Sequence, residues 1–314
     1  MSLPSILVTR HIPESALAIL RAAGRVDLPQ DPPAAEALRA AVRGRDAIVT
    51  MLTDRVDDAL LEAAGPSLKI VANVAVGYDN IDVAAARARN VVVTNTPDVL
   101  TGAVAEFTWG LILGITRRIG EGDRLIRRDG WHGWSFTFMT GMELTGKQLG
   151  IIGPGRIGRA VASRASAFGM HVVFGARQGA GVLDGHPVVG IDEAVATSDV
   201  VSLHVPLRPD TRHLIDAAAI ARMKKTAYLV NTARGPIVDE AALAAALRDG
   251  VIAGAALDVF EREPLVHPDL LPLENVLLVP HLGSATIETR TAMAELAARN
   301  VADVLAGRAP TTAV

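Results

Sequence analysis

Three polar residues in the second half of the chain carry groups that together could perform acid–base chemistry on a small carboxylic acid. Arg234, Glu263 and His281 each follow a short apolar run that is typical of a β-strand. Open α/β sheets bind ligands at the carboxyl ends of their strands. At that edge a guanidinium could hold a carboxylate, and an imidazole could exchange a proton. Any one of these residues alone would more often be structural or solvated, whereas the three together predict catalysis.

A glycine-rich loop predicts a bound dinucleotide. The run Gly153-Pro154-Gly155-Arg156-Ile157-Gly158 follows an apolar strand and opens a helix, which is the context this fingerprint requires. The first glycine permits a tight turn, the second lets the backbone approach the pyrophosphate, and the third lets helix and strand pack closely. The helix N-terminus then offers unpaired N–H groups to an anion. Pro154 departs from the common pattern and removes one of these donors.

The end of the next predicted strand indicates which dinucleotide is preferred. NAD enzymes place an acidic residue there to bind the ribose 2′-hydroxyl, but here the strand ends in Gly175-Ala176-Arg177. Arg177 could pair with a 2′-phosphate through two hydrogen bonds, and Gly175 leaves room for it. We therefore expect NADP(H) to be preferred. If Arg177 is only a solvated surface residue, NAD(H) is the alternative.

Short strands alternate with Ala-rich helical stretches, which predicts an α/β fold of two Rossmann-like, doubly wound parallel-sheet domains. The expected strands lie near Ile6–Thr9, Ala47–Met51, Ile70–Val74, Val91–Thr94, Leu149–Ile152, His171–Phe174, Val200–Leu203, Ala227–Asn231, Ala253–Asp258 and Val276–Leu278. The expected helices lie near Glu14–Ala23, Asp57–Ala64, Val83–Arg89, Ala103–Ile119, Arg156–Phe168 and Ala285–Leu305.

The domain boundaries follow from two interruptions of this alternation. An aromatic connector with Trp131 and Trp134 separates the two series of strands, and the last helix has no strand after it. We expect that helix to return to the first domain, which is then discontinuous. Residues 1–98 and 286–314 are predicted to form a flavodoxin-like substrate-binding domain, and residues 99–285 a dinucleotide-binding Rossmann domain.

Composition excludes several classes of protein and partner. Of 314 residues, 50% are hydrophobic and 21% are charged, which is the balance of a globular chain. The net charge of −3 favours neither nucleic acid nor an anionic membrane as a partner. Without cysteine the chain has no disulfide or thiolate metal site, and we expect no metal in the site. No signal-peptide pattern opens the chain, so we expect a cytoplasmic protein.

The chain resembles the D-isomer-specific 2-hydroxyacid dehydrogenases, and within them the glyoxylate and hydroxypyruvate reductases. The resemblance covers essentially the whole length, and its five motifs match in order and approximate spacing. They are the run Asn73-Val74-Ala75-Val76-Gly77-Tyr78-Asp79-Asn80-Ile81-Asp82, the Gly153 loop, and the segments around Arg234, Glu263 and His281.

The resemblance implies the catalytic roles. Arg234 would grip the carboxylate of a 2-keto acid and polarise its keto oxygen, His281 would be the acid and base, and Glu263 would pair with its other ring nitrogen. Hydride arriving at the keto carbon leaves an alkoxide, so a charged imidazole must deliver a proton. We therefore expect reduction to be fast at mildly acidic to neutral pH and to fade as the pH rises.

Other positions carry over from the resemblance to the substrate and the cofactor. The substrate-binding set is Leu52, Val76 and Gly77, with Arg234 and His281. The cofactor-binding set adds Thr101, Val205, Pro206, Thr232, Ala233, Asp258 and Gly283 to the Gly153–Gly158 loop and Arg177. Asp258 would accept from the nicotinamide carboxamide. The aromatic connector implies a homodimer, with Trp134 either reaching the partner's site or packing locally.

Several related activities stay open, and one different class is weighed against them. Phosphite dehydrogenases place a lysine where this chain has Val76, and formate dehydrogenases lack the Glu–His pair, so both are disfavoured. Phosphoglycerate dehydrogenase, D-lactate dehydrogenase and 2-ketogluconate reductase are alternatives. Some relatives are nucleotide-sensing binding modules without catalysis, and the complete set of Arg234, Glu263 and His281 argues against that role.

Overall fold

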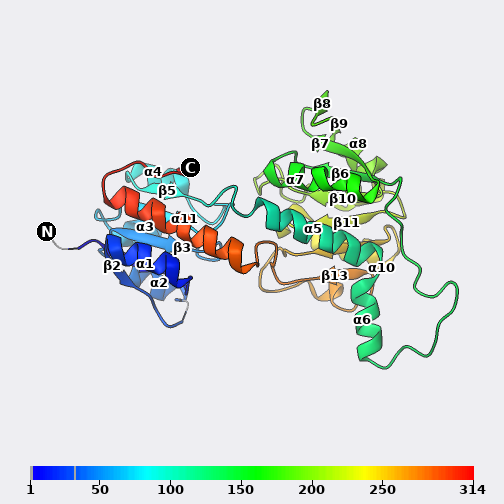
Figure 1. Cartoon of the computed structure of the whole chain (residues 1–314), viewed down its shortest axis with the longest axis horizontal. Coiled ribbons are helices and arrows are strands. Elements are labelled where there is room, and N and C mark those ends of the chain that lie inside the picture. The colour runs from blue at the N-terminus through cyan, green and yellow to red at the C-terminus, as the bar shows by residue number, and fades with distance from the viewer. Residues whose placement is uncertain (1–2, 32) are drawn as a thin grey trace. The chain divides into compact units, whose positions relative to one another are not determined.

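The computed structural model describes residues 3–31 and 33–314, which divide into two compact units. The first unit joins the chain up to Leu100 with Ala285–Val314, and the second spans Thr101–Ser284 (Figure 1). Each unit is built around its own largely parallel sheet. The expected α/β fold class, with two such sheets and a discontinuous first domain, is confirmed; the functions assigned to the two domains stay predictions.

The first unit is a five-stranded parallel sheet in the order β2-β1-β3-β4-β5, with helices on both faces. Helices α1 and α11 lie side by side on one face, and α2, α3 and α4 cover the other. The strands alternate sides, so that in β1 Ile6 and Val8 join one core and Leu7 the other. The elements are β1 (Ser5–Val8), α1 (Glu14–Ala23), β2 (Arg25–Asp27), α2 (Ala35–Ala41), β3 (Ala47–Thr50), α3 (Asp58–Ala64), β4 (Ile70–Asn73), α4 (Val83–Ala88), β5 (Val92–Thr94) and α11 (Ile287–Leu305).

The second unit has an eight-stranded sheet in the order β13-β12-β11-β10-β6-β7-β9-β8, in which only β8 runs antiparallel to its neighbour. Helices α5 and α7 cover one face, and α8, α9 and α10 cover the other. The regular elements are α5 (Thr101–Thr116), α6 (Ile119–Arg127), β6 (Gln148–Ile152), α7 (Arg156–Ala165), η1 (Ser166–Phe168), β7 (His171–Ala176), β8 (Val182–Leu183), β9 (His186–Gly190), α8 (Ile191–Thr197), β10 (Val200–Leu203), α9 (Ala217–Arg222), β11 (Tyr228–Asn231), η2 (Gly235–Ile237), α10 (Glu240–Arg248), β12 (Gly254–Leu257), η3 (Pro268–Leu270) and β13 (Val276–Leu278).

The strand order of the second unit reverses at β6. The chain first adds β7 on one side of β6 and later adds β10 on the other side. Such a reversal is the topological switch point, where doubly wound sheets bind their ligand at the carboxyl ends of the strands. The Gly153 loop begins directly after β6, so it lies at this point.

The long helix expected over Ala103–Ile119 is present as α5, but it ends at Thr116, and a second helix that was not predicted, α6, begins at Ile119. Between the two helices Arg118 adopts a left-handed conformation with φ 54°. The Arg118 guanidinium makes two hydrogen bonds to Glu121, at 2.8 and 2.7 Å, and these stabilise the break. After α6 the connector runs as a long loop without helix or strand to β6 (Figure 1). Among the described residues, no helix combines the length and apolar character needed to cross a membrane.

Candidate active site

The predicted acid–base pair is formed in the structure. The Nδ1 atom of His281 lies 2.9 Å from the Oε2 atom of Glu263, and each side chain is 26% exposed. Glu263 lies in the loop after β12, and His281 lies three residues beyond the end of β13. Because β12 and β13 are parallel neighbours, both residues stand at the carboxyl edge of the sheet. The Nε2 atom of His281 is the ring nitrogen that this pair leaves for another partner.

Asp258 holds the loop that carries His281. Its two carboxylate oxygens accept hydrogen bonds from the backbone N–H groups of Leu282 (2.6 Å) and Gly283 (2.9 Å). The backbone N–H of His281 donates to the Asp258 carbonyl oxygen at 2.8 Å. These bonds support an unusual conformation, because His281 is a non-glycine residue with φ 53°. Asp258 is buried, and burial raises its pKa even though the two N–H groups lower it. Its expected contact with a nicotinamide carboxamide stays a prediction.

Glu263 is held by its own loop and is ionised there. Its Oε1 atom accepts the backbone N–H of Phe260 at 3.1 Å, which leaves Oε2 for His281. Burial raises the pKa of Glu263, but the hydrogen bond and charge of His281, the Phe260 N–H and the charge of Arg234 outweigh it. The pKa therefore lies below its usual value. A carboxylate in this state can keep an imidazolium oriented and charged.

A second pair of glutamates fixes the turn from which Glu263 projects. The N–H of Glu261 donates to the Oε1 atom of Glu240 at 2.6 Å, and the N–H of Glu240 donates to Oε1 of Glu261 at 3.1 Å. Glu240 is only 4% exposed. This reciprocal contact could not be predicted from the sequence, because Glu240 lies outside the motifs and its pairing with Glu261 depends on how the loops pack.

The segment that carries Arg234 is packed directly onto the Glu263 loop. A Cβ atom at Gly235 would lie 1.9 Å from the carbonyl carbon of Phe260, so only glycine fits. On the other side Asn231, at the end of β11, accepts the Ala233 N–H at 3.0 Å and donates to the Arg234 carbonyl oxygen at 2.9 Å. The structure thus brings Arg234, Glu263 and His281 to the ends of three neighbouring strands, β11, β12 and β13.

The glycine loop has the geometry that a dinucleotide requires. Gly153 has φ 100°, and a Cβ atom there would lie 2.8 Å from the His204 carbonyl carbon. A Cβ atom at Gly158 would lie 2.3 Å from the Gly153 carbonyl oxygen, so α7 approaches β6 closely only because this residue is glycine. At Gly155 a Cβ atom would meet no atom within 4 Å, and α7 begins at the next residue. These residues fit a pyrophosphate at the helix N-terminus.

Arg177 lies directly after β7, next to the glycine loop, and forms an ion pair with Asp210. The glycine loop lies beside the end of β7, because the Gly153 N–H donates to the Gly175 carbonyl oxygen at 3.0 Å. Asp210 could not be identified from the sequence, because it lies in a polar turn without a motif. Its pairing depends on the strand order, which the sequence near it does not reveal.

The remaining residues predicted to contact the cofactor lie at the same edge of the second unit or beside it. Val205 lies against Gly153, since a Cβ atom at Gly153 would stand 2.8 Å from its Cγ1 atom. The hydroxyl of Thr232 lies 3.0 Å from that of Thr108 in α5. The carbonyl oxygen of Pro206 accepts the Thr211 hydroxyl at 2.7 Å. Thr101 is the first residue of α5.

The predicted substrate residues of the first unit lie in two neighbouring loops. Leu52 follows β3, and Val76 and Gly77 follow β4, the next strand in the sheet. Asn80 links these loops, because its side-chain amide donates to the carbonyl oxygens of Met51 (3.1 Å) and Asp54 (2.9 Å). The carbonyl oxygens of Val76 and Gly77 accept from the side-chain amides of Asn95 (2.8 Å) and Asn73 (2.9 Å). The loop backbone is therefore fixed by side-chain amides.

Two other histidines have different surroundings from His281. Burial lowers the pKa of His204 to about 4, so its imidazole is neutral near pH 7. Its Nε2 atom lies 2.8 Å from the Ser202 hydroxyl. The Nε2 atom of His213 lies 3.2 Å from Glu261, not from Glu263. Within residues 3–31 and 33–314, no group of three or more His, Asp or Glu side chains is arranged to hold a metal ion.

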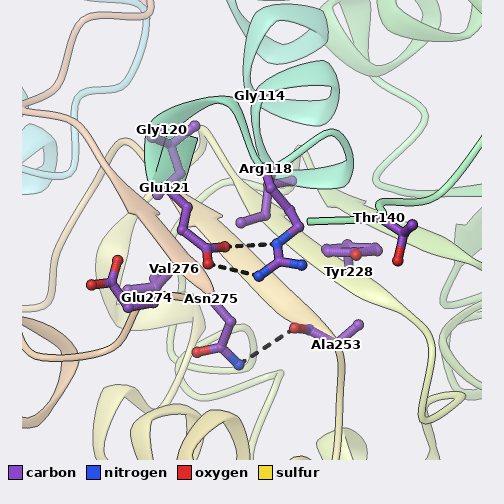
Figure 2. A pocket seen from close by; sticks show the side chains of 12 residues that line it. Gly114, Arg118, Gly120, Glu121, Thr140, Tyr228, Ala253, Glu274, Asn275 and Val276 are labelled. Atoms are coloured by element: carbon purple, nitrogen blue, oxygen red, sulfur yellow. Dashed lines mark hydrogen bonds and ion pairs between the residues drawn. The ribbon is translucent and has the colours of Figure 1, made fainter. Parts of the chain in front are cut away.

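A pocket of about 350 Å³ lies at the amino-end edge of the sheet of the second unit, opposite the edge that carries His281 and Glu263 (Figure 2). Tyr228, Ala253 and Val276 line it, and they lie at the amino ends of β11, β12 and β13. Figure 2 shows Arg118 and Glu121 paired with each other at this pocket. Because ligands of such sheets bind at the carboxyl ends, the other edge of the sheet is the candidate active site.

Known proteins resemble this chain over almost its whole length. The sequence profile of the D-isomer specific 2-hydroxyacid dehydrogenase NAD binding domain matches residues 109–283. The chain is 48% identical to the glyoxylate reductase of Thermofilum pendens over 99% of this chain and 94% of the relative, and 47% identical to that of Aeropyrum pernix over 99% and 95%. A solved structure from Thermus thermophilus is 42% identical with a TM-score of 0.93, covering 99% of both chains. The NADPH-dependent glyoxylate/hydroxypyruvate reductase of Sinorhizobium meliloti, solved with NADP and malonate, is 36% identical with a TM-score of 0.88, covering 100% of this chain and 97% of that one.

Proposed function

The chain belongs to the D-isomer specific 2-hydroxyacid dehydrogenases, and on that premise we propose that it reduces glyoxylate or hydroxypyruvate with NADPH. The observation that carries the proposal is the 2.9 Å contact between His281 and Glu263 at the ligand-binding edge of the second unit. Relatives that are 44–48% identical over nearly the whole chain bear the name glyoxylate reductase. This supports a small 2-keto acid as the substrate.

The chain's own residues account for the proton transfer and for binding of the substrate. The bound nicotinamide cofactor supplies the hydride for the keto carbon. His281 gives a proton from Nε2 to the keto oxygen, because Nδ1 is occupied by Glu263. Glu263 stabilises the charged imidazole before the proton leaves. The guanidinium of Arg234 holds the substrate carboxylate and stabilises negative charge that develops on the neighbouring oxygen.

The preference for NADPH rests on Arg177. It follows β7 at the position where a carboxylate would favour NADH, and its guanidinium can bind a 2′-phosphate. The Sinorhizobium meliloti relative, whose name states NADPH dependence, supports the same preference. NAD(H) is the alternative cofactor.

A homodimer is part of the proposal. The connector exposes Trp131, Trp134, Phe136 and Phe138, and α6 has no buried residue. Exposed apolar groups gathered in one segment of a globular protein usually mark an interface. A second copy of the chain would cover them, and sedimentation velocity measures this directly.

A panel of substrates and both cofactors tests the function. Oxidation of NADPH and of NADH is followed with glyoxylate, hydroxypyruvate, pyruvate, phenylpyruvate and 2-ketogluconate. We expect the highest kcat/KM for glyoxylate or hydroxypyruvate with NADPH. A higher value for 2-ketogluconate or pyruvate would reassign the substrate, and a clear excess with NADH would remove the role of Arg177. No oxidation with any substrate would support a nucleotide-sensing protein without catalysis.

A further inference from the structure

An ion pair joins the two loops that flank the glycine turn of the second unit. Arg177 directly follows β7, and Asp210 lies in the loop after β10. In the sheet, β7 and β10 are the two neighbours of β6, which leads into Gly153. The pair therefore connects the strand ends on either side of the dinucleotide-binding turn.

Hydrogen bonds fix the backbone on the Asp210 side of the pair. The N–H of His204 donates to the Ile152 carbonyl oxygen at 2.7 Å, which extends the pairing of β10 with β6. Next to Asp210, the buried Thr211 hydroxyl accepts the Arg208 N–H at 2.8 Å and donates to the Pro206 carbonyl oxygen at 2.7 Å. These bonds fix the turn that carries Asp210, so the backbone presents its carboxylate to Arg177.

The pair is weak enough to exchange. The side chains of Arg177 and Asp210 are 57% and 51% exposed, and solvent screens an ion pair at such positions. A phosphate monoester carries up to two negative charges and accepts two parallel hydrogen bonds from a guanidinium. A phosphate monoester is therefore a stronger partner for Arg177 than a carboxylate, but it must replace the Asp210 carboxylate that already pairs with the guanidinium.

We propose that Asp210 is a specificity-determining residue, because Arg177 exchanges it for the 2′-phosphate of NADP(H) and keeps it when NAD(H) binds. The inference rests on the proposed contact of Arg177 with the cofactor. With NADH, Asp210 continues to neutralise the guanidinium, so no unpaired charge is left beside the ribose 2′-hydroxyl. When NADPH binds, Arg177 loses its ion pair with Asp210, and this loss offsets part of the binding free energy gained from the 2′-phosphate. Asp210 thus makes the preference for NADPH over NADH smaller than it would be without this carboxylate.

Calorimetry with two adenosine nucleotides tests this exchange on the full chain without catalysis. Adenosine 2′,5′-bisphosphate carries the 2′-phosphate, and adenosine 5′-monophosphate lacks it. In Asp210→Asn we expect the bisphosphate to bind about three- to tenfold more tightly at low salt, with less gain at high salt. Binding of the monophosphate should stay within about twofold. The control is Asp58→Asn, which removes the exposed carboxylate that pairs with Arg89 in the first unit, and it should change neither.

A second background shows whether Asp210 acts through Arg177. In Arg177→Gln, the further change Asp210→Asn should no longer tighten binding of the bisphosphate. The exchange would be overturned if Asp210→Asn tightened binding of the bisphosphate equally in the Arg177→Gln background. It would also be overturned if Asp210→Asn alone left this affinity unchanged or lowered it. If the enzyme fails to reduce glyoxylate, these binding results still stand. Equal affinity of the wild-type protein for both nucleotides would instead remove the proposed role of Arg177 in cofactor selection, and the exchange with it.

Discussion

Gly235 and Phe260 touch through their backbones, and this contact aligns two segments of the active site. A Cβ atom at Gly235 would lie 1.9 Å from the carbonyl carbon of Phe260 and 2.4 Å from the Glu261 nitrogen. Gly235 follows Arg234, and Phe260 begins the turn that ends at Glu263. The residue proposed to bind the substrate carboxylate and the residue proposed to orient the base are thus held at one fixed separation.

Replacing Gly235 with alanine should therefore disturb both segments. We expect kcat/KM for glyoxylate to fall about 100-fold, since displacements near 1 Å have effects of that size. The melting temperature should also fall, because the added methyl group overlaps backbone atoms that cannot move aside freely. The control is Gly190→Ala, where a Cβ atom would meet no atom within 4 Å. Wild-type kinetics in Gly235→Ala would show that this contact does not set the site geometry.

Glu263→Gln should alter the pH dependence of reduction as well as its rate. Glu263 is ionised both near pH 5.5 and near pH 8, because its pKa is held below its usual value. Glutamine keeps a hydrogen bond but removes the negative charge that stabilises a protonated His281. We expect kcat/KM to fall about tenfold or more near pH 8 and less near pH 5.5, so that the fall with rising pH begins earlier. A loss of equal size at both pH values would mean that the charge is not used.

Glu240→Gln keeps a side-chain oxygen that can accept the Glu261 N–H but removes the charge of the buried carboxylate. Burial raises the pKa of Glu240, and although the Glu261 N–H lowers it, the charge of Glu261 raises it further. A raised pKa means that the native state binds the proton more tightly than the unfolded chain, so ionisation weakens the fold. Relative to wild type, Glu240→Gln should gain stability as the pH rises above the ordinary value of 4.5. Melting curves at several pH values measure this, with the exposed Glu62→Gln as control; a difference that shrinks with rising pH would contradict it.

Arg177→Asp should reverse the choice of cofactor. The new carboxylate would repel a 2′-phosphate and could accept a hydrogen bond from the ribose 2′-hydroxyl. We expect the ratio of kcat/KM for NADPH to that for NADH to fall about 100-fold. The rate with saturating NADH should stay near that of wild type, because Arg177 lies away from the Glu263–His281 pair in the strand order. An unchanged ratio would show that another residue selects the cofactor.

Local sequence patterns were sufficient to predict most strands and the glycine loop, but not the contacts between them. The strand before Gly153 and the one ending at Asn231 are buried on both faces, so they appear as continuous apolar runs. Strand β2 has only three residues, two of them charged, and gives no such signal. Only Arg117 and Arg118 separate α5 from α6, and neither is a glycine or proline that would mark the end of α5. The contacts of Asp210, Glu240 and Gly235 depend on strand order and loop packing, which no local pattern encodes.

The role of His281 as the acid in glyoxylate reduction is tested by the rate of NADPH oxidation with glyoxylate, measured near pH 7 for the wild-type protein and for His281→Asn. Asparagine tolerates the left-handed conformation found at His281, so the loop should be preserved. We expect glyoxylate-dependent oxidation by the wild-type protein and a kcat about 100- to 10,000-fold lower in His281→Asn. Binding of NADPH, followed by its fluorescence, should be unchanged. A wild-type kcat in His281→Asn, or no oxidation by the wild-type protein, would contradict this role of His281.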